Sequence, residues 1–167
     1  MEQNNKIVIF NSSPLINLAK IDKLSLIEKL YGKIIIPEAV YNEVFIAGKN
    51  KNNTIKIFNL VENNLVEIIK IKNKELVKSF SRELDYGESE VIALAIDLNA
   101  DLVVIDEIEA RNIADVYDLN KTGFIGILIK AEKLGLVNSA LELIDLAIEE
   151  GFRIDKKLYE YVKNILE

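Results

Sequence analysis

The stretch IVIFNSSP, residues 7–14, predicts a buried strand that leads directly into a helix. Its first four residues are apolar and three of them are β-branched, which is typical of a strand inside a sheet. Ser12 or Ser13 can cap the following helix, and Pro14 suits the first turn, where its missing N–H has no intrahelical partner. A strand followed at once by a helix is the repeating unit of an α/β protein.

Later segments repeat this strand–helix unit and predict a parallel sheet. Short apolar runs predict strands, and apolar residues at helical spacing predict the segments between them. The expected strands cover residues 34–36, 66–71, 102–105 and 122–124. The expected helices cover residues 37–44, 86–99, 107–117, 125–134, 139–149 and 156–166, with two more before Gly32. Residues 47–53 are expected to form a loop, and residues 55–63 show no decisive pattern.

The length and composition allow one sizeable core, because the chain has 167 residues and half of them are hydrophobic. We expect a single domain over residues 1–167, in which residues 138–167 form a C-terminal helical extension. No uncharged apolar run reaches ~18 residues, and residues 1–6 are polar rather than the start of a signal segment. We therefore expect a soluble, cytoplasmic protein that does not enter a membrane.

Histidine and cysteine are both absent, which narrows the chemistry that this chain can perform. No Ser-His or Cys-His dyad can form, and no metal can be bound through imidazole or thiolate. A metal would have to be a hard cation held by oxygen, Mg²⁺ or Mn²⁺. The net charge of −6 argues against a broad basic face for nucleic acid. It does not exclude a nuclease, because bound cations reverse the local charge.

Acidic and amide side chains follow the predicted strands or begin the predicted helices. Parallel α/β sheets bind ligands at the carboxyl ends of their strands, where the strand order reverses. Because crowded carboxylates repel one another, a cluster at this edge favours divalent cations. The candidates for such a cluster are Asn11, Glu43, Glu88, Glu90, Asp106 and Glu107.

Each candidate also has a purely structural interpretation. Acidic residues are favoured in the first turn of any helix, so Glu88, Glu90 and Glu107 could serve only as partners of helix dipoles. Asp106 suits a helix N-cap as well as a metal site, and Glu43 by itself fits a solvated helix residue. The residues alone leave both interpretations open.

Taken together, the segments resemble the PIN-domain superfamily, and in particular its DUF3368 group of small prokaryotic proteins. The resemblance covers nearly the whole chain in the expected order. It is carried by IVIFNSSPLINLAKI (7–21), IIIPEAVYNEV (34–44), LDYGESEVIALA (84–95), VVIDEIEARNIA (103–114), TGFIGILIKAEKLGLV (122–137) and GFRIDKKLYEYV (151–162). It implies a three-layer α/β/α sandwich around a mostly parallel sheet. It also implies a ribonuclease site that uses Mg²⁺ or Mn²⁺, and many relatives are toxins of toxin–antitoxin pairs.

The resemblance assigns catalytic and metal-binding roles to the acidic candidates. Glu43 and Asp106 match two of the family's acids, and either Glu88 or Glu90 takes a third acidic role. The position after the first strand is normally a metal-binding Asp, and here it is Asn11. An amide oxygen can still bind Mg²⁺, but it lacks the charge that helps to offset cation dehydration.

Supporting roles follow from the same resemblance. Ser13 matches a hydroxyl near the metal, Glu107 matches a second acid after the fourth strand, and Arg111 matches a recurrent arginine. The leading hypothesis is a metal-dependent endoribonuclease, a hydrolase that is weakened or inactivated by Asn11. The rival is a catalytically silent PIN-fold module that binds RNA or a protein partner. A small-molecule phosphatase would need a nucleophilic Asp in place of Asn11.

The expected partners are an RNA substrate and, by resemblance, a small antitoxin protein. The segment 138–167 carries many apolar residues for two peripheral helices, among them Leu158 and Tyr161. These residues are explained equally well by a homodimer and by packing onto the main core.

Overall fold

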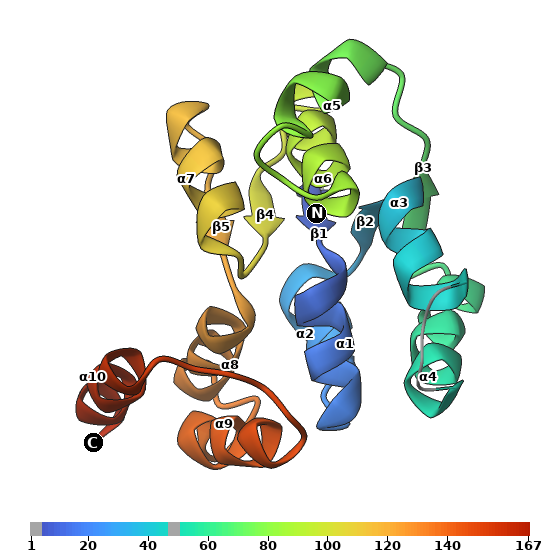
Figure 1. Ribbon diagram of the computed structural model, residues 1–167. Helices are drawn as coiled ribbons and strands as arrows, with labels where there is room; N and C mark the ends of the chain where they lie inside the picture. Colours follow the sequence, from blue (N-terminus) through green and yellow to red (C-terminus); the bar gives the residue numbers. More distant parts are fainter. Residues whose placement is uncertain (1–4, 47–50) are drawn as a thin grey trace.

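The computed structural model describes residues 5–46 and 51–167, and it places five parallel strands in one sheet (Figure 1). The strands are β1 (Val8–Phe10), β2 (Ile34–Pro37), β3 (Val66–Ile69), β4 (Leu102–Val104) and β5 (Lys121–Thr122). Their order across the sheet is β3-β2-β1-β4-β5, so β1 is central and pairs with both β2 and β4. The strand order therefore reverses at β1 and β4, the place where α/β sheets bind ligands.

The α-helices of the described residues follow the strands along the chain. They are α1 (Ser12–Lys20), α2 (Ser25–Tyr31), α3 (Glu38–Tyr41), α4 (Lys51–Glu62), α5 (Lys74–Phe80), α6 (Tyr86–Asp97), α7 (Ile108–Val116), α8 (Phe124–Lys133), α9 (Ala140–Glu149) and α10 (Lys156–Leu166). A π-helical turn, η1 (Asn42–Ile46), continues α3.

Helices cover both faces of the sheet, which confirms the predicted α/β/α sandwich (Figure 1). On one side α6 packs against β1, β2 and β4, with α5 and α7 beside it. On the other side α1 packs against α4 and α8. Residues 87–95 of α6 are all buried, because this helix lies between the sheet and its neighbouring helices. The first turns of α6 are thus held firmly beside the carboxyl edge of the sheet.

The start of α1 differs from the prediction. Asn11 occupies the N-cap position without a side-chain capping bond, and Ser12 and Ser13 are the first two helical residues. The prediction that either serine caps this helix is therefore wrong. Two of these polar side chains bond acids of other elements instead. Asn11 donates a hydrogen bond to Glu107, and Ser12 donates one to Glu43.

The segment after β2 also differs from the prediction. Because α4 begins at Lys51, the predicted loop over residues 47–53 is wrong for residues 51–53, while residues 47–50 lie outside the described residues. Most of the undecided segment 55–63 belongs to α4. Ile57 is fully buried, and α4 packs against α1, so tertiary contact stabilises a helix whose own pattern is weak. Other predicted boundaries agree with the structure within two residues.

The tail helices extend from α8, because α9 packs against α8 and α10 packs against α9 (Figure 1). Ile144 of α9 and Val162 of α10 are buried, so packing explains part of the apolar composition. Leu158, Tyr161 and Ile165 of α10 remain exposed. Within residues 5–46 and 51–167, no helix combines the length and apolar character needed to cross a membrane.

Candidate metal and active site

The ends of β1 and β4 bring Asn11 and Asp106 to the same edge of the sheet. Phe10 is in register with Val104, and the backbone N–H of Asn11 donates to the carbonyl of Val104 at 2.9 Å. Asn11 follows β1 directly, and Asp106 lies two residues beyond the end of β4. Neighbouring parallel strands therefore place these two side chains together, as the sequence pattern predicts.

Asp106 is held by the start of α8 and does not cap α7. Its Oδ1 accepts the backbone N–H of Phe124 at 2.8 Å, while its Oδ2 is buried and has no hydrogen-bond partner within the described residues. A Cβ on Gly123 would lie 2.3 Å from Oδ1, so only glycine allows this close approach. Burial, with a smaller contribution from the charge of Glu107, raises the pKa of Asp106 to about 6, although the hydrogen bond from Phe124 lowers it.

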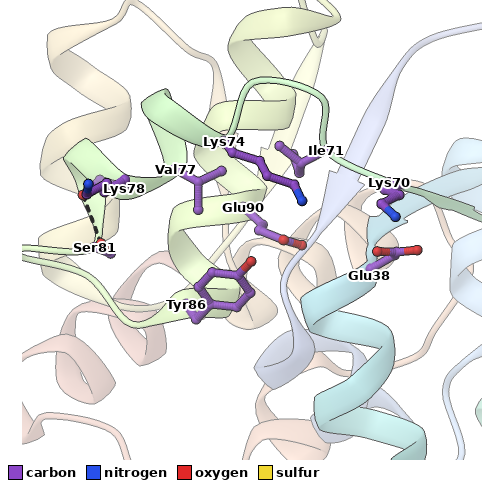
Figure 2. A pocket seen from close by; sticks show the side chains of 9 residues that line it. All are labelled: Glu38, Lys70, Ile71, Lys74, Val77, Lys78, Ser81, Tyr86 and Glu90. Carbon is purple, nitrogen blue, oxygen red and sulfur yellow. Dashed lines mark hydrogen bonds between the residues drawn. The ribbon is translucent and has the colours of Figure 1, made fainter.

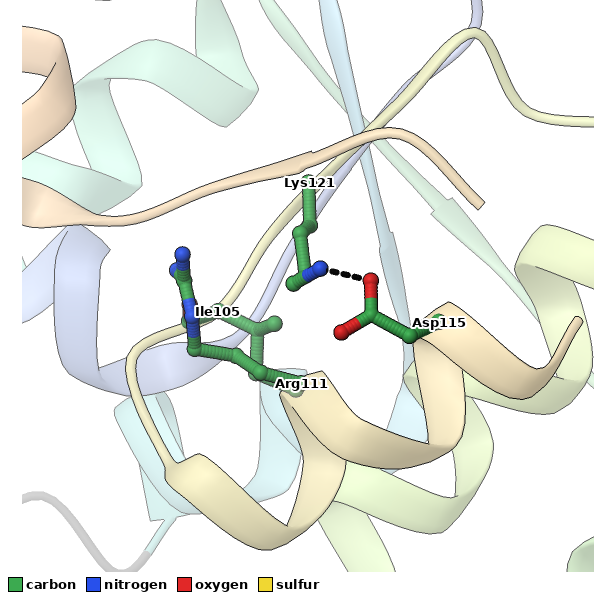
Figure 3. A network of polar contacts seen from close by, with 4 residues as sticks. All are labelled: Ile105, Arg111, Asp115 and Lys121. Carbon is green, nitrogen blue, oxygen red and sulfur yellow. Dashed lines mark hydrogen bonds and ion pairs between the residues drawn. The ribbon is translucent and has the colours of Figure 1, made fainter. Parts of the chain in front are cut away.

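Arg111 supports the end of β4 through the backbone. Its Nη1 donates to the carbonyl oxygen of Ile105 at 2.9 Å (Figure 3). Its positive charge lowers the pKa of Asp106, against the larger effect of burial. Asp115 and Lys121 form a separate ion pair that joins α7 to β5 (Figure 3). Arg111 thus favours the charged form of Asp106 and also holds the backbone just after β4 through its hydrogen bond to Ile105.

Asn11 is almost fully buried and faces Glu107. Its side chain is 3 % exposed, and its Nδ2 donates to Glu107 Oε2 at 3.2 Å. Its Oδ1 is buried without a hydrogen-bond partner in the described part of the chain. Most buried acceptors have a hydrogen-bond partner. Asn11 Oδ1 has none among the described residues, so it can accept a bond from a ligand or bind a cation.

Glu43 reaches the same edge from the π-helical turn η1. Its Oε2 accepts the hydroxyl of Ser12 at 2.5 Å, and a Cβ on Gly87 would lie 2.0 Å from its Oε1. Burial raises the pKa of Glu43 most, and the charges of Asp85 and Glu107 add to the effect. Glu43 is therefore no solvated helix residue, and the close approach of its carboxylate requires glycine at the start of α6.

Glu88 and Glu90 both make helix-terminal hydrogen bonds. Glu88 and Asp85 form a capping box, in which Glu88 Oε2 accepts the Asp85 N–H at 3.0 Å and Asp85 Oδ1 accepts the Glu88 N–H at 2.8 Å. Glu90 Oε2 accepts the N–H of Ala39 at 2.9 Å and so caps α3. Burial raises the pKa of Glu88 to about 7, with Asp85 and Glu107 contributing.

Glu107 is the common neighbour of the acids at this edge. Its charge raises the pKa of Glu43, of Glu88 and of Asp106. It also accepts the hydrogen bond from Asn11. The sequence indicated Glu107 only as a supporting residue, because its spacing along the chain does not show that it faces three separate elements.

The sequence also left the contacts of three other residues unassigned. Ser12, not Ser13, bonds Glu43, and Ser13 makes no side-chain hydrogen bond within the described residues. Asp85 and Gly87 were expected to form a turn. In the structure Asp85 caps α6, and Gly87 leaves room for the carboxylate of Glu43 because it has no side chain. The run DYGESE over residues 85–90 was a usable signal, because it contains the D-x-x-E spacing of a capping box.

The oxygen atoms at this edge are of the kind that binds a hard cation, but the acidic side chains lie too far apart to hold one together. Among residues 5–46 and 51–167, no three acidic side chains lie close enough to hold a metal ion as they stand. Asn11 Oδ1 and Asp106 Oδ2 are nevertheless two unpartnered oxygens at neighbouring strand ends. Amide and carboxylate oxygens are the ligands that Mg²⁺ and Mn²⁺ prefer. Burial is the largest cause of the raised pKa values of Glu43, Glu88 and Asp106, so a bound cation would favour their charged forms.

The parallel sheet and the buried polar oxygens at its carboxyl edge define an α/β protein with a candidate metal site. A family model described as PIN domain, DUF3368, matches residues 7–167, and the chain belongs to this family. The comparison with curated proteins finds no match. Family membership thus assigns the nuclease-type fold to nearly the whole chain.

Proposed function

We propose that this protein is a metal-dependent endoribonuclease of PIN type whose activity is weakened by Asn11. The observation that carries the proposal is the pair of buried, unpartnered oxygens, Asn11 Oδ1 and Asp106 Oδ2, at the ends of β1 and β4. Family membership supports a nuclease, and the absence of histidine and cysteine leaves oxygen ligands as the chemistry available.

In this proposal Asp106, Asn11 and Glu43 hold Mg²⁺ or Mn²⁺, with Glu107 close behind Asn11. The bound cation would supply an activated water and neutralise charge on the scissile phosphate. The protein holds its ligands ready: Phe124 fixes one oxygen of Asp106, and Ser12 fixes one oxygen of Glu43. Such preorganised groups need little rearrangement when charge develops.

Asn11 weakens this site for two reasons. Its amide brings no negative charge to the cation, and its Nδ2 donates to Glu107 and so uses part of the charge of that carboxylate. An aspartate at this position would restore the charge and leave Glu107 without its amide donor. We therefore expect weak or undetectable cleavage by the natural chain and higher activity after Asn11→Asp.

Cleavage of single-stranded RNA in Mn²⁺ tests the proposal. Asn11→Asp should raise or create activity, and Asp106→Asn in that background should lower the rate by two to three orders of magnitude, about 3–4 kcal/mol of transition-state stabilisation. EDTA should abolish the activity. Asp97→Asn, an exposed aspartate at the end of α6, is the matched control and should change little.

Two results would contradict the enzyme proposal. Cleavage that survives Asp106→Asn or EDTA would indicate a contaminating nuclease or another site. If the Asn11→Asp protein binds Mn²⁺ but cuts no RNA, the silent PIN-fold module becomes the better explanation. The hydrogen bond from Asn11 to Glu107 favours that second candidate, because it stabilises the acids without a metal.

The assembly of this protein belongs to the same proposal. By family resemblance, a small antitoxin would bind at the acidic edge, with a charge-assisted contact from an arginine. Separately, the exposed Leu158, Tyr161 and Ile165 of α10 suit a homodimer. The mass of the protein purified from its native source distinguishes monomer, dimer and complex, and a plain monomer would contradict both assemblies.

A further inference from the structure

A groove lies beside the acidic edge, between the end of β3, α5 and the starts of α3 and α6 (Figure 2). Its volume is about 340 Å³. The polar residues that matter are Lys70, Lys74, Lys78, Tyr86, Glu38 and Glu90. None of the lysines entered the sequence interpretation, because they lie in a segment, residues 70–78, with no catalytic pattern.

The three lysines of this groove have free charges. Lys70, Lys74 and Lys78 are exposed, and none of them forms an ion pair within the described residues. Lys74 and Lys78 are one helical turn apart on α5, so their side chains leave the same face. The groove is thus lined by three exposed lysines that a negatively charged ligand can contact.

The two acids of the groove offset only part of this positive charge. Glu90 is 5 % exposed and already accepts the backbone N–H of Ala39. Glu38 is exposed and lies directly below Lys70 (Figure 2). The exposed cationic groups are thus more numerous than the exposed carboxylates along the groove.

Tyr86 adds an aromatic surface at the start of α6. It is 61 % exposed, and its ring stands beside Glu90 in the groove (Figure 2). A large aromatic ring with this exposure is available for stacking on a base, which tolerates any base sequence.

The groove and the acidic edge are neighbours at the start of α6. Tyr86 is followed by Gly87, whose backbone lies against the carboxylate of Glu43. Glu90, which lines the groove, is close enough for its charge to act on Glu43. The start of α6 therefore links the lysine groove to the acidic edge.

We propose that this lysine groove binds the sugar–phosphate backbone of single-stranded RNA next to the acidic edge, with one base stacked on Tyr86. The inference deepens the proposed ribonuclease and rests on it. Charge complementarity selects a polyanion, and the exposed ring selects a nucleic acid over an acidic peptide. The lysines hold the phosphates by charge, while the acids next to them need a cation before a phosphate can approach.

The test measures binding of a labelled single-stranded RNA of about 12 nucleotides by fluorescence anisotropy in EDTA. The full chain is compared with Lys74→Gln/Lys78→Gln and with a matched control, Lys156→Gln/Lys157→Gln, which removes two exposed lysines from α10. We expect the groove variant to bind about tenfold or more weakly at about 0.1 M salt, with the salt slope reduced by about 1.4. The control should stay within about twofold of the natural chain.

A second variant, Tyr86→Leu, separates stacking from charge. It should weaken RNA binding about fivefold or more and leave the salt slope unchanged. Polyglutamate serves as the competing polyanion, and we expect it to bind more weakly than RNA.

Several results would overturn this inference. They are no binding of RNA by the natural chain, equal losses in the groove and control variants, no effect of Tyr86→Leu, or binding of polyglutamate as tight as that of RNA. Circular dichroism at matched concentrations verifies that the variants are folded. Because EDTA removes metal and cleavage, RNA binding can succeed where the cleavage test fails, and the two proposals are judged separately.

Discussion

Two groups of polar side chains border the same end of the sheet, and they differ in what their oxygens do. Glu88 closes the capping box of α6, and Glu90 caps α3, so each has a structural hydrogen bond to backbone. At the ends of β1 and β4, Asn11 and Asp106 each keep one buried oxygen without a partner in the described residues. Asp106 Oδ1 also accepts a backbone N–H, that of Phe124, so the difference lies in the second oxygen, which among these residues is buried without a partner only at the strand ends.

This difference distinguishes the helix-start carboxylates, which cap helices, from the strand-end oxygens of Asn11 and Asp106, which we propose bind a ligand. A carboxylate that caps a helix stabilises it whether or not a metal is present. A buried oxygen without a partner costs free energy until something binds it. We therefore expect metal binding to depend on the strand-end group and folding to depend on the helix-start group.

The largest expected effect concerns Mn²⁺ affinity in the Asn11→Asp background. Asp106→Asn removes a charged ligand and should weaken Mn²⁺ binding about tenfold or more, as measured by calorimetric titration. Glu90→Gln is the comparison from the other group and should stay within about twofold, because Glu90 has no buried oxygen without a partner in the described residues. Equal losses in the two variants would remove the distinction between the groups.

A smaller effect is expected from Gly123→Ala in the same background. The new Cβ would lie 2.3 Å from Asp106 Oδ1, so the carboxylate must move away from the Phe124 N–H. We expect Mn²⁺ affinity to fall severalfold, about 1 kcal/mol, and the free energy of unfolding to fall by about 1 kcal/mol for the lost hydrogen bond. Calorimetric titration and thermal melting measure the two quantities, and an unchanged affinity would show that Asp106 does not need its present position.

The smallest effect is the pH dependence of stability without metal. The pKa of Glu88 is raised from 4.5 to about 7 in the folded state. Its protonation therefore stabilises the fold fully below about pH 4.5, and this contribution is lost as the pH rises through 7. We expect a loss on the order of 1 kcal/mol, reduced by partial solvation.

Glu88→Gln gives the matched comparison for this pH effect. Glutamine keeps the capping-box acceptor and does not titrate, so the fall in melting temperature between about pH 5 and 7.5 should become shallower. Thermal melting in EDTA at several pH values measures it. An identical slope in both proteins would assign the pH dependence to the other acids of this edge.

Several features of the fold follow from local sequence alone. The run at residues 7–10 and the run at 102–105 are too apolar and β-branched for exposed segments, and both became central strands. The position of Asp106 near the edge follows from its place after such a run. By contrast, α4 was not recognisable, because its apolar residues are sparse and its helical form depends on packing against α1.

The roles of the acids illustrate the limit of sequence patterns. From residue type and position alone, Glu88, Glu90 and Glu107 shared one structural interpretation, as partners of helix dipoles, and only the family resemblance gave them different roles. Only the structure shows that Glu88 caps its own helix, that Glu90 caps α3 and that Glu107 accepts a hydrogen bond from Asn11. A side chain's direction depends on which helix lies next to it, and neighbouring helices are distant in the sequence.

The sequence by itself determined the parallel α/β class, the oxygen-only chemistry and the presence of Asn11 and Asp106 at strand ends. These properties depend on residue type and on short-range order along the chain. The tertiary structure decided which oxygens remain unpartnered, which serine meets Glu43 and that three unpaired lysines lie beside the acids. Those properties depend on contacts between residues far apart in the chain, and hydrogen bonding is decided by distances of a few tenths of an ångström.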